Sequence, residues 1–539
     1  MKKFISIALI LILYLSLAAG CSSGEGMVSA QSSRDSNEVI IAFPAIPAHF
    51  DPMLGFGADG HGGGQRLIFS ALLETDAYMN IIPGLAMGYT ISEDALVYTF
   101  SLRSDARFSD SSPVTADDIL FSYQTLMQNA TGIDLALIER IEAQDDTVTI
   151  TLSRPQSTFI LTVSQVSIVP RNTYSSDFGM NPIGSGPFRL AQFDLDQQFI
   201  LEANPYYHGQ APQIERAVFV RIGDEDARLA SVRAGIVDIA PTSAVLAAAI
   251  SDIPGYHLMI AETVDNMGIV LPTIPNEGVV NQFGFPIGHE FTYDLNFRRA
   301  LAYGIDRDAI INYALRGFAS PAFTENDGLP WSNPESRIEF DIEYAISLLE
   351  DSGWIIGSDG IRHRDGQRAS IPLMYAAGDS ARQAVAMALS QQARENLGIE
   401  IIVGGFSWDE IGRRMFSEPL MLAWGSLNPI TSFHLFHSSF AGLDDFYNPQ
   451  NFTNPVVDRY LELAISARTL EEAIPYFHLA QWDGTNGTSM RGDSPFIFLV
   501  NLSHLYWVRD GLDTGRRPIH AHGSSWPLVQ NLREWSWIE

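Results

Sequence analysis

Two pairs of histidines are spaced closely enough to act on one metal ion. His434 and His437 lie three residues apart, which would place both imidazoles on one face of a helix. His520 and His522 lie two residues apart near the C-terminus. A protein metal site usually needs three or four ligands, and neither pair is accompanied by others at a firm spacing. Structural or solvated histidines are favoured, His434 and His437 stay weak metal candidates, and no cofactor is expected.

The glycine run Gly60-His-Gly-Gly-Gly64 has the composition of an oxyanion loop, which in esterases stabilises a negatively charged intermediate. That chemistry also needs a nucleophilic serine in a Gly-x-Ser-x-Gly turn, and the sequence contains none. A hydrolase is therefore a distant alternative. Glycine backbone also lets a ligand approach closely, so His61, Gly62 and Gly63 are candidates for lining a cleft, with a plain flexible turn as the alternative.

Other catalytic classes are excluded by missing residue types. Lys2 and Lys3 are the only lysines, so the chain has neither a phosphate-binding loop with its lysine nor a lysine Schiff base after residue 3. Cys21 is the only cysteine, which rules out an internal disulfide. We expect no enzymatic activity and name no catalytic residue.

Cys21 also ends a short hydrophobic leader. Lys2 and Lys3 are followed by an apolar run from Phe4 to Leu17 and then by Ala18-Ala19-Gly20. The run has about 14 residues, fewer than the roughly 20 that span a bilayer. The segment resembles the lipobox of bacterial lipoproteins, which implies a signal peptide over 1–20, lipid attachment at Cys21 and an extracytoplasmic, membrane-anchored protein. Residues 21–37, rich in Ser and Gly, read as a flexible tether.

The composition predicts a large, acidic, globular protein. A chain of 539 residues suits two or three folded domains, and a hydrophobic content of 46% allows each a core. Lysine and arginine together number 33 against 63 Asp and Glu, a formal net charge of −30. Nucleic-acid binding needs a basic surface and is therefore not expected. The same charge repels anionic lipid headgroups, so the membrane link should be the lipid alone.

Helices and strands alternate along the chain, as expected of an α/β fold. Alternating apolar residues predict strands at 96–102, 147–152, 217–222 and 399–403. Thr115 and Asp118 form a capping-box pattern ahead of a helix, and Asp341 begins another. One helix is predicted from Arg298 to Leu315. Another is capped by Ser380 and ends near Gly398.

Five segments resemble the family 5 solute-binding proteins of ABC importers, which take up peptides, nickel complexes and related solutes. The first comprises Tyr98–Arg103, Phe108–Asp110 and Pro113–Ile119, and the second comprises Gly184–Phe188 with Asn204–Tyr207. The others are Arg228–Ile239, Asn296–Asp306, and the C-terminal stretch with tryptophans from Trp526 to Trp537.

The resemblance implies a two-lobed type II periplasmic-binding-protein fold with an extra inserted subdomain, the arrangement called cluster C. Lobe I would be discontinuous, and the two lobes would close over a ligand about a hinge. The implied ranges are 38–74, 185–262 and 499–539 for lobe I, 75–184 for the inserted subdomain, and 263–498 for lobe II.

Two candidate ligand residues follow the family's pocket segment, here Trp424-Gly-Ser-Leu-Asn-Pro429. The resemblance implies that Trp424 packs on the ligand and that Asn428 lies near it; the alternative for Trp424 is a plain core position. Many peptide binders in the family carry an aspartate shortly after this glycine, which pairs with the peptide amine. Ser426, Leu427 and Asn428 stand here instead, which favours a metal chelate or a solute without a free amine.

Further candidates come from position. Arg382 falls near where dipeptide-binding relatives place an arginine for the ligand carboxylate, and the alternative is a surface ion pair with Asp379. Met53 and His61 follow Phe50-Asp-Pro52, a region that borders the family's cleft. The prediction is a monomeric binding protein that captures peptides or peptide-like solutes, or alternatively a nickel or other metal chelate, for an ABC permease.

Overall fold

The computed structural model describes residues 37–54, 64–129, 133–250, 252–443, 446–522 and 526–538. The leader, Cys21, nearly all of the tether, His61, Gly62 and Gly63 lie outside the described residues. Within the described part, no helix combines the length and the apolar character that crossing a membrane requires.

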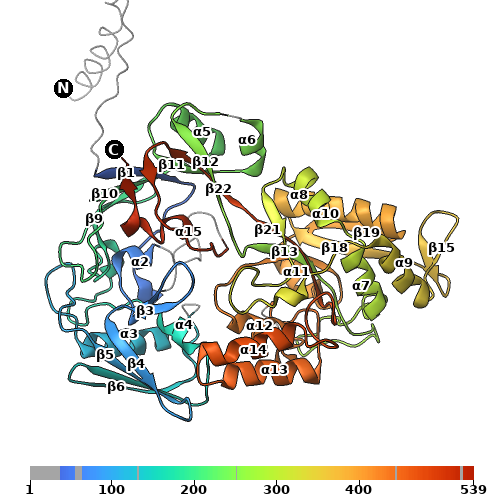
Figure 1. The fold of residues 1–539 in the computed structure, drawn as a ribbon, viewed down its shortest axis with the longest axis horizontal. Coiled ribbons are helices and arrows are strands. Elements are labelled where there is room, and N and C mark those ends of the chain that lie inside the picture. Colours follow the sequence, from blue (N-terminus) through green and yellow to red (C-terminus); the bar gives the residue numbers. More distant parts are fainter. Residues whose placement is uncertain are drawn as a thin grey trace, which may run out of the picture. The chain divides into compact units, whose positions relative to one another are not determined.

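The first large sheet has seven strands, in the order β12-β22-β11-β1-β10-β9-β8 (Figure 1). Its central strand β1 (Glu38–Phe43) runs parallel to β10 (Arg216–Arg221) and β11 (Ile239–Thr242). The other pairings are antiparallel. The remaining strands are β8 (Phe188–Asp194), β9 (Gln198–Ala203), β12 (Tyr256–Ala261) and β22 (His504–Arg509).

Aromatic side chains tie the end of the chain to this sheet. Phe199 and Phe219 stack with their ring centroids 4.3 Å apart, and Trp526 packs edge-on against Phe43 at 5.2 Å. Trp526 begins the short helix α15 (Trp526–Val529). Burial of these large rings explains why a segment so distant in sequence docks beside β1.

A separate antiparallel sheet of four strands carries the helix α3 (Ala116–Gln128). The Asp118 carboxylate accepts hydrogen bonds from the backbone N–H of Thr115 at 2.8 Å and from its hydroxyl at 2.7 Å, so the predicted helix start is confirmed. The predicted strands at 96–102 and 147–152 are also present. The strands are β4 (Ala86–Ile91), β5 (Val97–Leu102), β6 (Ile138–Gln144) and β7 (Thr147–Leu152).

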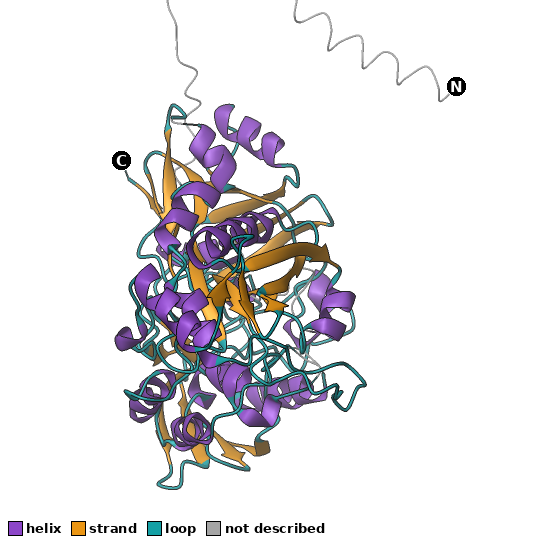
Figure 2. Cartoon of the chain, turned by 90° about the vertical axis from the view of Figure 1, so that its right-hand side faces the viewer, coloured by secondary structure: helices purple, strands orange, loops and turns teal. Residues whose placement is uncertain are grey.

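The second large sheet has six strands, in the order β14-β21-β13-β20-β18-β19. Its strand β18 (Ser370–Ala376) runs parallel to both neighbours. Helices pack around these strands (Figure 2). The other strands are β13 (Asn266–Val270), β14 (Ala319–Pro321), β19 (Glu400–Phe406), β20 (Leu420–Trp424) and β21 (Phe496–Leu502).

Two helix predictions were wrong in detail. The segment expected to form one helix is divided into α7 (Leu295–Tyr303) and α8 (Arg307–Ala314), because Gly304 ends the first and the Asp306 side chain caps the second by accepting from the backbone of Ala309 at 3.0 Å. The next predicted helix, α10 (Ser380–Gln392), is capped by Asp379 rather than Ser380. A π-helical turn extends it to Leu397, and Gly398 follows with a left-handed φ of 65°.

The remaining elements are shorter or connect the sheets. The helix α9 (Ile342–Asp351) begins after Asp341, as predicted. The other helices are α2 (Gln65–Ile68), α4 (Phe159–Val163), α5 (Glu225–Arg233), α6 (Ala244–Ala249), α11 (Trp408–Arg414), α12 (Ile430–Phe436), α13 (Pro455–Ser466) and α14 (Leu470–Gln481). The other strands are β2 (Leu73–Thr75), β3 (Ile81–Pro83), β15 (Ile355–Ile356), β16 (Arg362–Arg364), β17 (Gln367–Arg368), β23 (Leu512–Asp513) and β24 (Ser536–Trp537).

The chain passes between the two large sheets at two adjacent crossings. The first, residues 262–265, joins β12 to β13, and the second, Ser503, joins β21 to β22. The crossings bond to each other: the Thr263 hydroxyl donates to the carbonyl of Leu502 at 2.6 Å, and the N–H of Leu502 donates to the carbonyl of Asp265 at 2.9 Å. Short connections that lie side by side can serve as a pivot between the parts they join.

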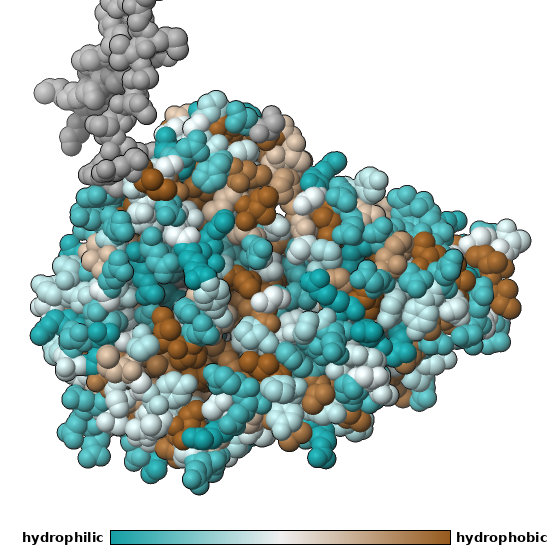
Figure 3. Space-filling view, in the orientation of Figure 1, coloured by the Kyte–Doolittle hydropathy of each residue, from teal (hydrophilic) through white to brown (hydrophobic). Residues whose placement is uncertain are grey.

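Hydrophilic residues cover most of the face seen in Figure 3, and hydrophobic residues are scattered among them rather than gathered in one broad patch. Apolar residues scattered in this way are ordinary on a protein surface and need no explanation of their own.

Candidate functional site

A cavity of about 560 Å³ is lined by segments that are far apart in the sequence. On one side lie α2, the turn between β2 and β3, and the C-terminal segment that packs on the seven-stranded sheet. On the other side lies the loop that follows β20 of the six-stranded sheet. The lining residues are Arg66, Thr75, Asp76, Ala77, Tyr78, Met79, Ile82, Leu161, Ser164, Gln165, Ser167, Gly425, Ser426, Leu427, Arg516, Pro518, Ala521, Gln530, Asn531, Arg533 and Glu534. Clefts of 300–1,000 Å³ between domains are typical sites for small ligands.

The loop after β20 brings the predicted pocket segment to the cavity. Gly425, Ser426 and Leu427 line it directly, whereas Trp424 is half-buried at the end of the strand. The Trp424 ring lies 6.3 Å from that of Tyr447, which itself lies 4.5 Å from the ring of His434. Trp424 therefore stands beside the cavity within a small aromatic group, and direct contact with a ligand stays a prediction.

Gly425 connects this loop to the crossings between the sheets. A β-carbon at this position would lie 2.9 Å from the backbone nitrogen of His522 and 3.2 Å from the Cα of Asp265, so a larger residue would push these segments apart. The N–H of His522 also donates to the carbonyl of Gly425 at 3.0 Å. Movement at the crossings would therefore displace the loop that lines the cavity.

Two other predicted residues have structural partners. The buried side chain of Asn428 accepts from the backbone N–H of Ile430 at 3.0 Å, at the start of α12. Met53 lies in the core, in a short 3-10 helix, and its carbonyl accepts from the side-chain amide of Asn129 at 2.7 Å. Neither is among the residues that line the cavity.

The glycine run can be followed only at its last member, Gly64. A β-carbon there would lie 2.4 Å from the Trp526 ring, so glycine is required by the close packing of backbone on ring. This position serves the fold.

Arg382 already has a carboxylate partner. Its Nη1 donates to Asp379 Oδ2 at 2.7 Å, and its guanidinium lies 5.5 Å from the centroid of the Trp408 ring. The ion pair that we considered as the alternative is therefore present. Binding of a ligand carboxylate by Arg382 stays a prediction, and it would have to compete with Asp379.

The histidines of α12 have separate surroundings. His434 lies in the last turn of the helix and packs against Phe440 and Tyr447, and burial lowers the pKa of its imidazole. His437 lies just beyond the helix and stacks on Phe433 at 4.4 Å. Across the described ranges, no three His, Cys, Asp or Glu side chains are grouped as metal ligands.

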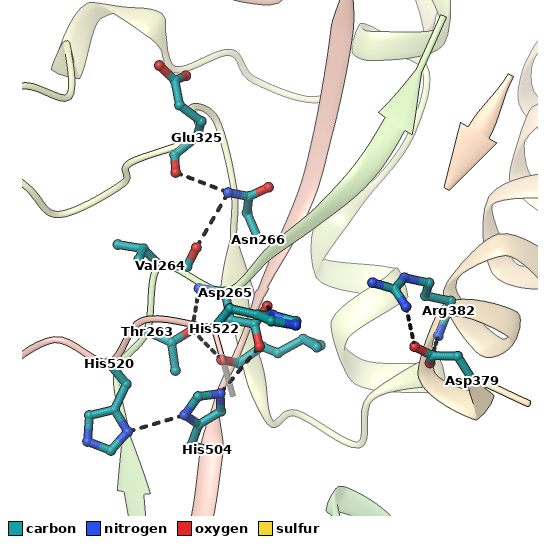
Figure 4. A network of polar contacts seen from close by, with 11 residues as sticks. Thr263, Val264, Asp265, Asn266, Glu325, Asp379, Arg382, His504, His520 and His522 are labelled. Carbon is teal, nitrogen blue, oxygen red and sulfur yellow. Dashed lines mark hydrogen bonds and ion pairs between the residues drawn. The ribbon is translucent and has the colours of Figure 1, made fainter. Parts of the chain in front are cut away.

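The two C-terminal histidines belong to a polar cluster at the crossings, which we call the crossing cluster: Asp265, His504, His520 and His522 (Figure 4). The Asp265 carboxylate lies 2.6 Å from His522 Nδ1 and 3.3 Å from His504 Nε2. The other ring nitrogen of His504, Nδ1, lies 3.2 Å from His520 Nδ1. A single carboxylate thus connects both crossings and the segment that leads to the C-terminus.

Protonation differs sharply within the crossing cluster. Burial alone would raise the pKa of Asp265, but hydrogen bonds with His504 and His522 lower it to about 2. The hydrogen bond to Asp265 raises the pKa of His522. Burial, together with the nearby His504 and Arg517, lowers the pKa of His520 to about 3. His520 is therefore neutral near pH 7, and Asp265 is charged.

Sequence reasoning missed Asp265, His504 and the arginines of the cavity. Asp265 and His504 are isolated in the sequence and become neighbours only because β21 and β22 belong to different sheets. Arg66 could have been found from the sequence, because it closely follows the glycine run that was predicted to line a cleft. Arginines and histidines are also the only basic side chains after residue 3.

Comparison with known proteins identifies the family. A family model described as "Bacterial extracellular solute-binding proteins, family 5 Middle" matches residues 80–459. This chain belongs to that family. Family 5 proteins are components of transport systems and not enzymes. Among curated relatives, Protein XP55 of Streptomyces lividans is 30% identical over 515 residues, covering 92% of this chain and 89% of the relative. The oligopeptide-binding protein AppA of Bacillus subtilis is 23% identical over 463 residues, covering 81% and 82%.

Solved structures share the fold. NikZ of Campylobacter jejuni, in complex with Ni(L-His), superposes with a TM-score of 0.72 at 24% identity, over 93% of this chain and 100% of that one. AppA of Bacillus subtilis, in complex with a nonapeptide, gives 0.68 at 20% identity, over 93% and 99%. The predicted two-lobed α/β fold is confirmed, and the family is one of extracytoplasmic solute-binding proteins.

Proposed function

We propose that this family 5 protein captures peptides or peptide-like solutes in the cavity and delivers them unchanged to the permease of an ABC importer. The observation that carries the proposal is the cavity itself, because its lining combines the turn after β2 with the loop after β20, one from each side of the crossings. A ligand that contacts both sides stabilises the closed arrangement over the open one, and a permease can detect that difference.

The same observation supports a division into two lobes, and we propose from the family resemblance that the protein acts as a monomer. The seven-stranded sheet and the four-stranded sheet would form lobe I with its inserted subdomain, and the six-stranded sheet would form lobe II. Residues 262–265 and Ser503 would act as the hinge, with the crossing cluster holding the two connections together.

The test is direct binding to the purified chain. Native mass spectrometry of protein purified from its own cell should show a co-purifying solute, and calorimetry should show saturable, 1:1 binding of that solute or of short peptides. The bound solute should be recovered intact. Recovery of a cleaved solute would support the distant hydrolase alternative, and failure of every peptide to bind would contradict the peptide assignment.

A metal chelate is the second candidate cargo. The part of the loop that lines the cavity, Gly425 to Leu427, carries no carboxylate that could pair with the amine of a peptide. Ni(L-His), the complex named for NikZ, is the natural probe. Saturable binding of Ni(L-His), with no response to short peptides, would replace the first assignment with the second.

Attachment to a bacterial membrane, on its outer or periplasmic side, is proposed from the sequence around Cys21. A Cys21→Ser variant should leave the membrane fraction, as followed by fractionation and immunoblotting, while its affinity for the solute stays the same. Continued retention of the variant in the membrane fraction would contradict a lipid anchor at Cys21.

A further inference from the structure

Two of the three arginines that line the cavity have no carboxylate partner among the residues that the structure describes. Arg66 makes one long contact, from Nη1 to the Thr75 hydroxyl at 3.5 Å. The guanidinium of Arg516 lies 3.7 Å from the centroid of the Tyr78 ring. Within the described parts of the chain, neither guanidinium forms an ion pair. We call these two residues the arginine pair.

The third arginine shows the contrast. Arg533 donates from Nη1 to Glu74 at 2.9 Å and to the Tyr207 hydroxyl at 3.0 Å, and Glu534 lies 4.0 Å from its Nε. Its charge is therefore balanced within the protein, and Glu74 is engaged in doing so. Arg533 has the contacts of a structural ion pair.

Of the two acidic residues in the lining, Asp76 and Glu534, Asp76 is hydrogen-bonded within its own turn. Asp76 accepts hydrogen bonds from the backbone N–H groups of Tyr78 and Asn80 at 2.8 and 2.9 Å, and from the Asn80 side chain at 2.9 Å. These bonds hold the turn between β2 and β3 in shape. Arg66 contacts Thr75, the last residue of β2, and Arg516 lies against Tyr78 in this turn, so both members of the arginine pair lie beside the turn.

The environment of Arg66 makes its charge available to a ligand. Its side chain is exposed and lines the cavity, and partial desolvation of the guanidinium lowers the pKa of Arg66, with Glu74 opposing the shift. The guanidinium nonetheless stays protonated near neutral pH, because the ordinary pKa of an arginine lies far above 7.

Positive charge that forms no ion pair within the described residues is unusual for a chain of formal net charge −30. A guanidinium donates two parallel hydrogen bonds to one carboxylate, and charge-assisted bonds of this kind are among the strongest in proteins. The opposite wall, Gly425 to Leu427, is uncharged. The wall that carries Arg66 and Arg516 therefore suits the anionic end of a solute.

We propose that Arg66 and Arg516 bind a carboxylate of the transported solute and so orient it with this group toward the turn between β2 and β3. This inference rests on the proposed function and adds the chemical class of the cargo: a solute with at least one free carboxylate. For a peptide, the group would be the C-terminal carboxylate.

The test compares alanine peptides of two to five residues that carry either a free C-terminal carboxylate or a C-terminal amide. By calorimetry, the wild-type protein should bind the free form at least tenfold more tightly than the amide. In the double variant R66Q/R516Q this preference should fall below threefold, because the free form loses affinity and the amide does not. A preference that persists in the double variant would overturn the proposal.

Two controls keep the outcomes distinct. The variant R189Q removes an exposed arginine that pairs with Glu202 on the seven-stranded sheet, and it should keep the preference, which excludes a general effect of net charge. If neither peptide form binds, the peptide assignment fails, and propane-1,2,3-tricarboxylate then tests the arginine pair alone. It should raise the thermal midpoint of the wild type but not of R66Q/R516Q, and no response in the wild type would overturn the arginine pair as an anion site.

Discussion

The crossing cluster and the arginine pair place charge in opposite ways. In the crossing cluster, Asp265 is buried and bonded to two histidines. In the cavity, Arg66 and Arg516 are exposed and make no ion pair among the described residues. A buried charge is tolerated only when it has partners within the protein, whereas a charge that binds a ligand must have no such partner. The difference separates residues that hold the two sheets together from residues that can recognise a solute.

The largest expected effect is on the crossing cluster. Replacing Asp265 with alanine should lower the free energy of unfolding by about 3 kcal/mol, because His504 and His522 lose a buried carboxylate partner. Urea unfolding followed by tryptophan fluorescence measures the change. The matched variant Arg66→Gln should change stability by no more than about 0.5 kcal/mol, since it removes no ion pair. Equal stability of the two variants would remove the distinction between the two regions.

The second effect concerns pH. The pKa of His520 is about 3 in the folded chain and close to 6.5 when unfolded, so between these values the unfolded chain binds a proton that the folded chain does not. Stability should therefore fall as pH falls through this window, by about 2 kcal/mol between pH 6.5 and 5 from this residue. His520→Gln should flatten that part of the stability profile. An unchanged slope would show that His520 is already protonated in the folded protein.

His522 should act in the opposite direction. Its pKa is raised by Asp265, so its contribution to stability is complete below pH 6.5 and is lost as pH rises through the higher pKa of the folded state. The same series of unfolding measurements, extended above pH 6.5 on His522→Gln, should show a smaller loss of stability than the wild type shows.

A smaller effect is expected on the loop side of the cavity. Trp424→Ala should weaken solute binding at least tenfold, about 1.4 kcal/mol, because the half-buried ring supports the loop from Gly425 to Leu427. Its thermal midpoint should fall by only a few degrees. A variant that fails to fold would show that Trp424 is a core residue.

The smallest effect is expected at Arg382. Arg382→Gln should change solute affinity less than twofold, because Asp379 already balances this charge. Calorimetry on Arg382→Gln and Arg66→Gln, with the same solute, compares a paired and an unpaired arginine directly. A tenfold loss for Arg382→Gln would show that it binds a ligand carboxylate, as the sequence comparison predicted, and would make the arginine pair secondary.

Local patterns predicted local structure well. Thr115 and Asp118 are three residues apart, and the helix start that they predicted is present because the contact needs nothing else in the chain. The break at Gly304 was missed because the apolar periodicity continues across it. There, Asp306 begins a second helix by accepting a hydrogen bond from the backbone N–H of Ala309, and this cap satisfies one of the N–H groups that a new helix start leaves unpaired.

The sequence by itself determined the family, the acidic character of the chain and the segment after Trp424 that reaches the cavity, because these depend on residue types and on short spacings. Only the tertiary structure decided which charges are paired. Asp265 and His504 are 239 positions apart, and Arg66 and Arg516 come from opposite ends of the chain. The contact between Asp265 and His504 depends on how β21 and β22 divide between two sheets, and the place of Arg66 and Arg516 in one cavity depends on how the C-terminal segment docks. No local pattern of residues records either arrangement.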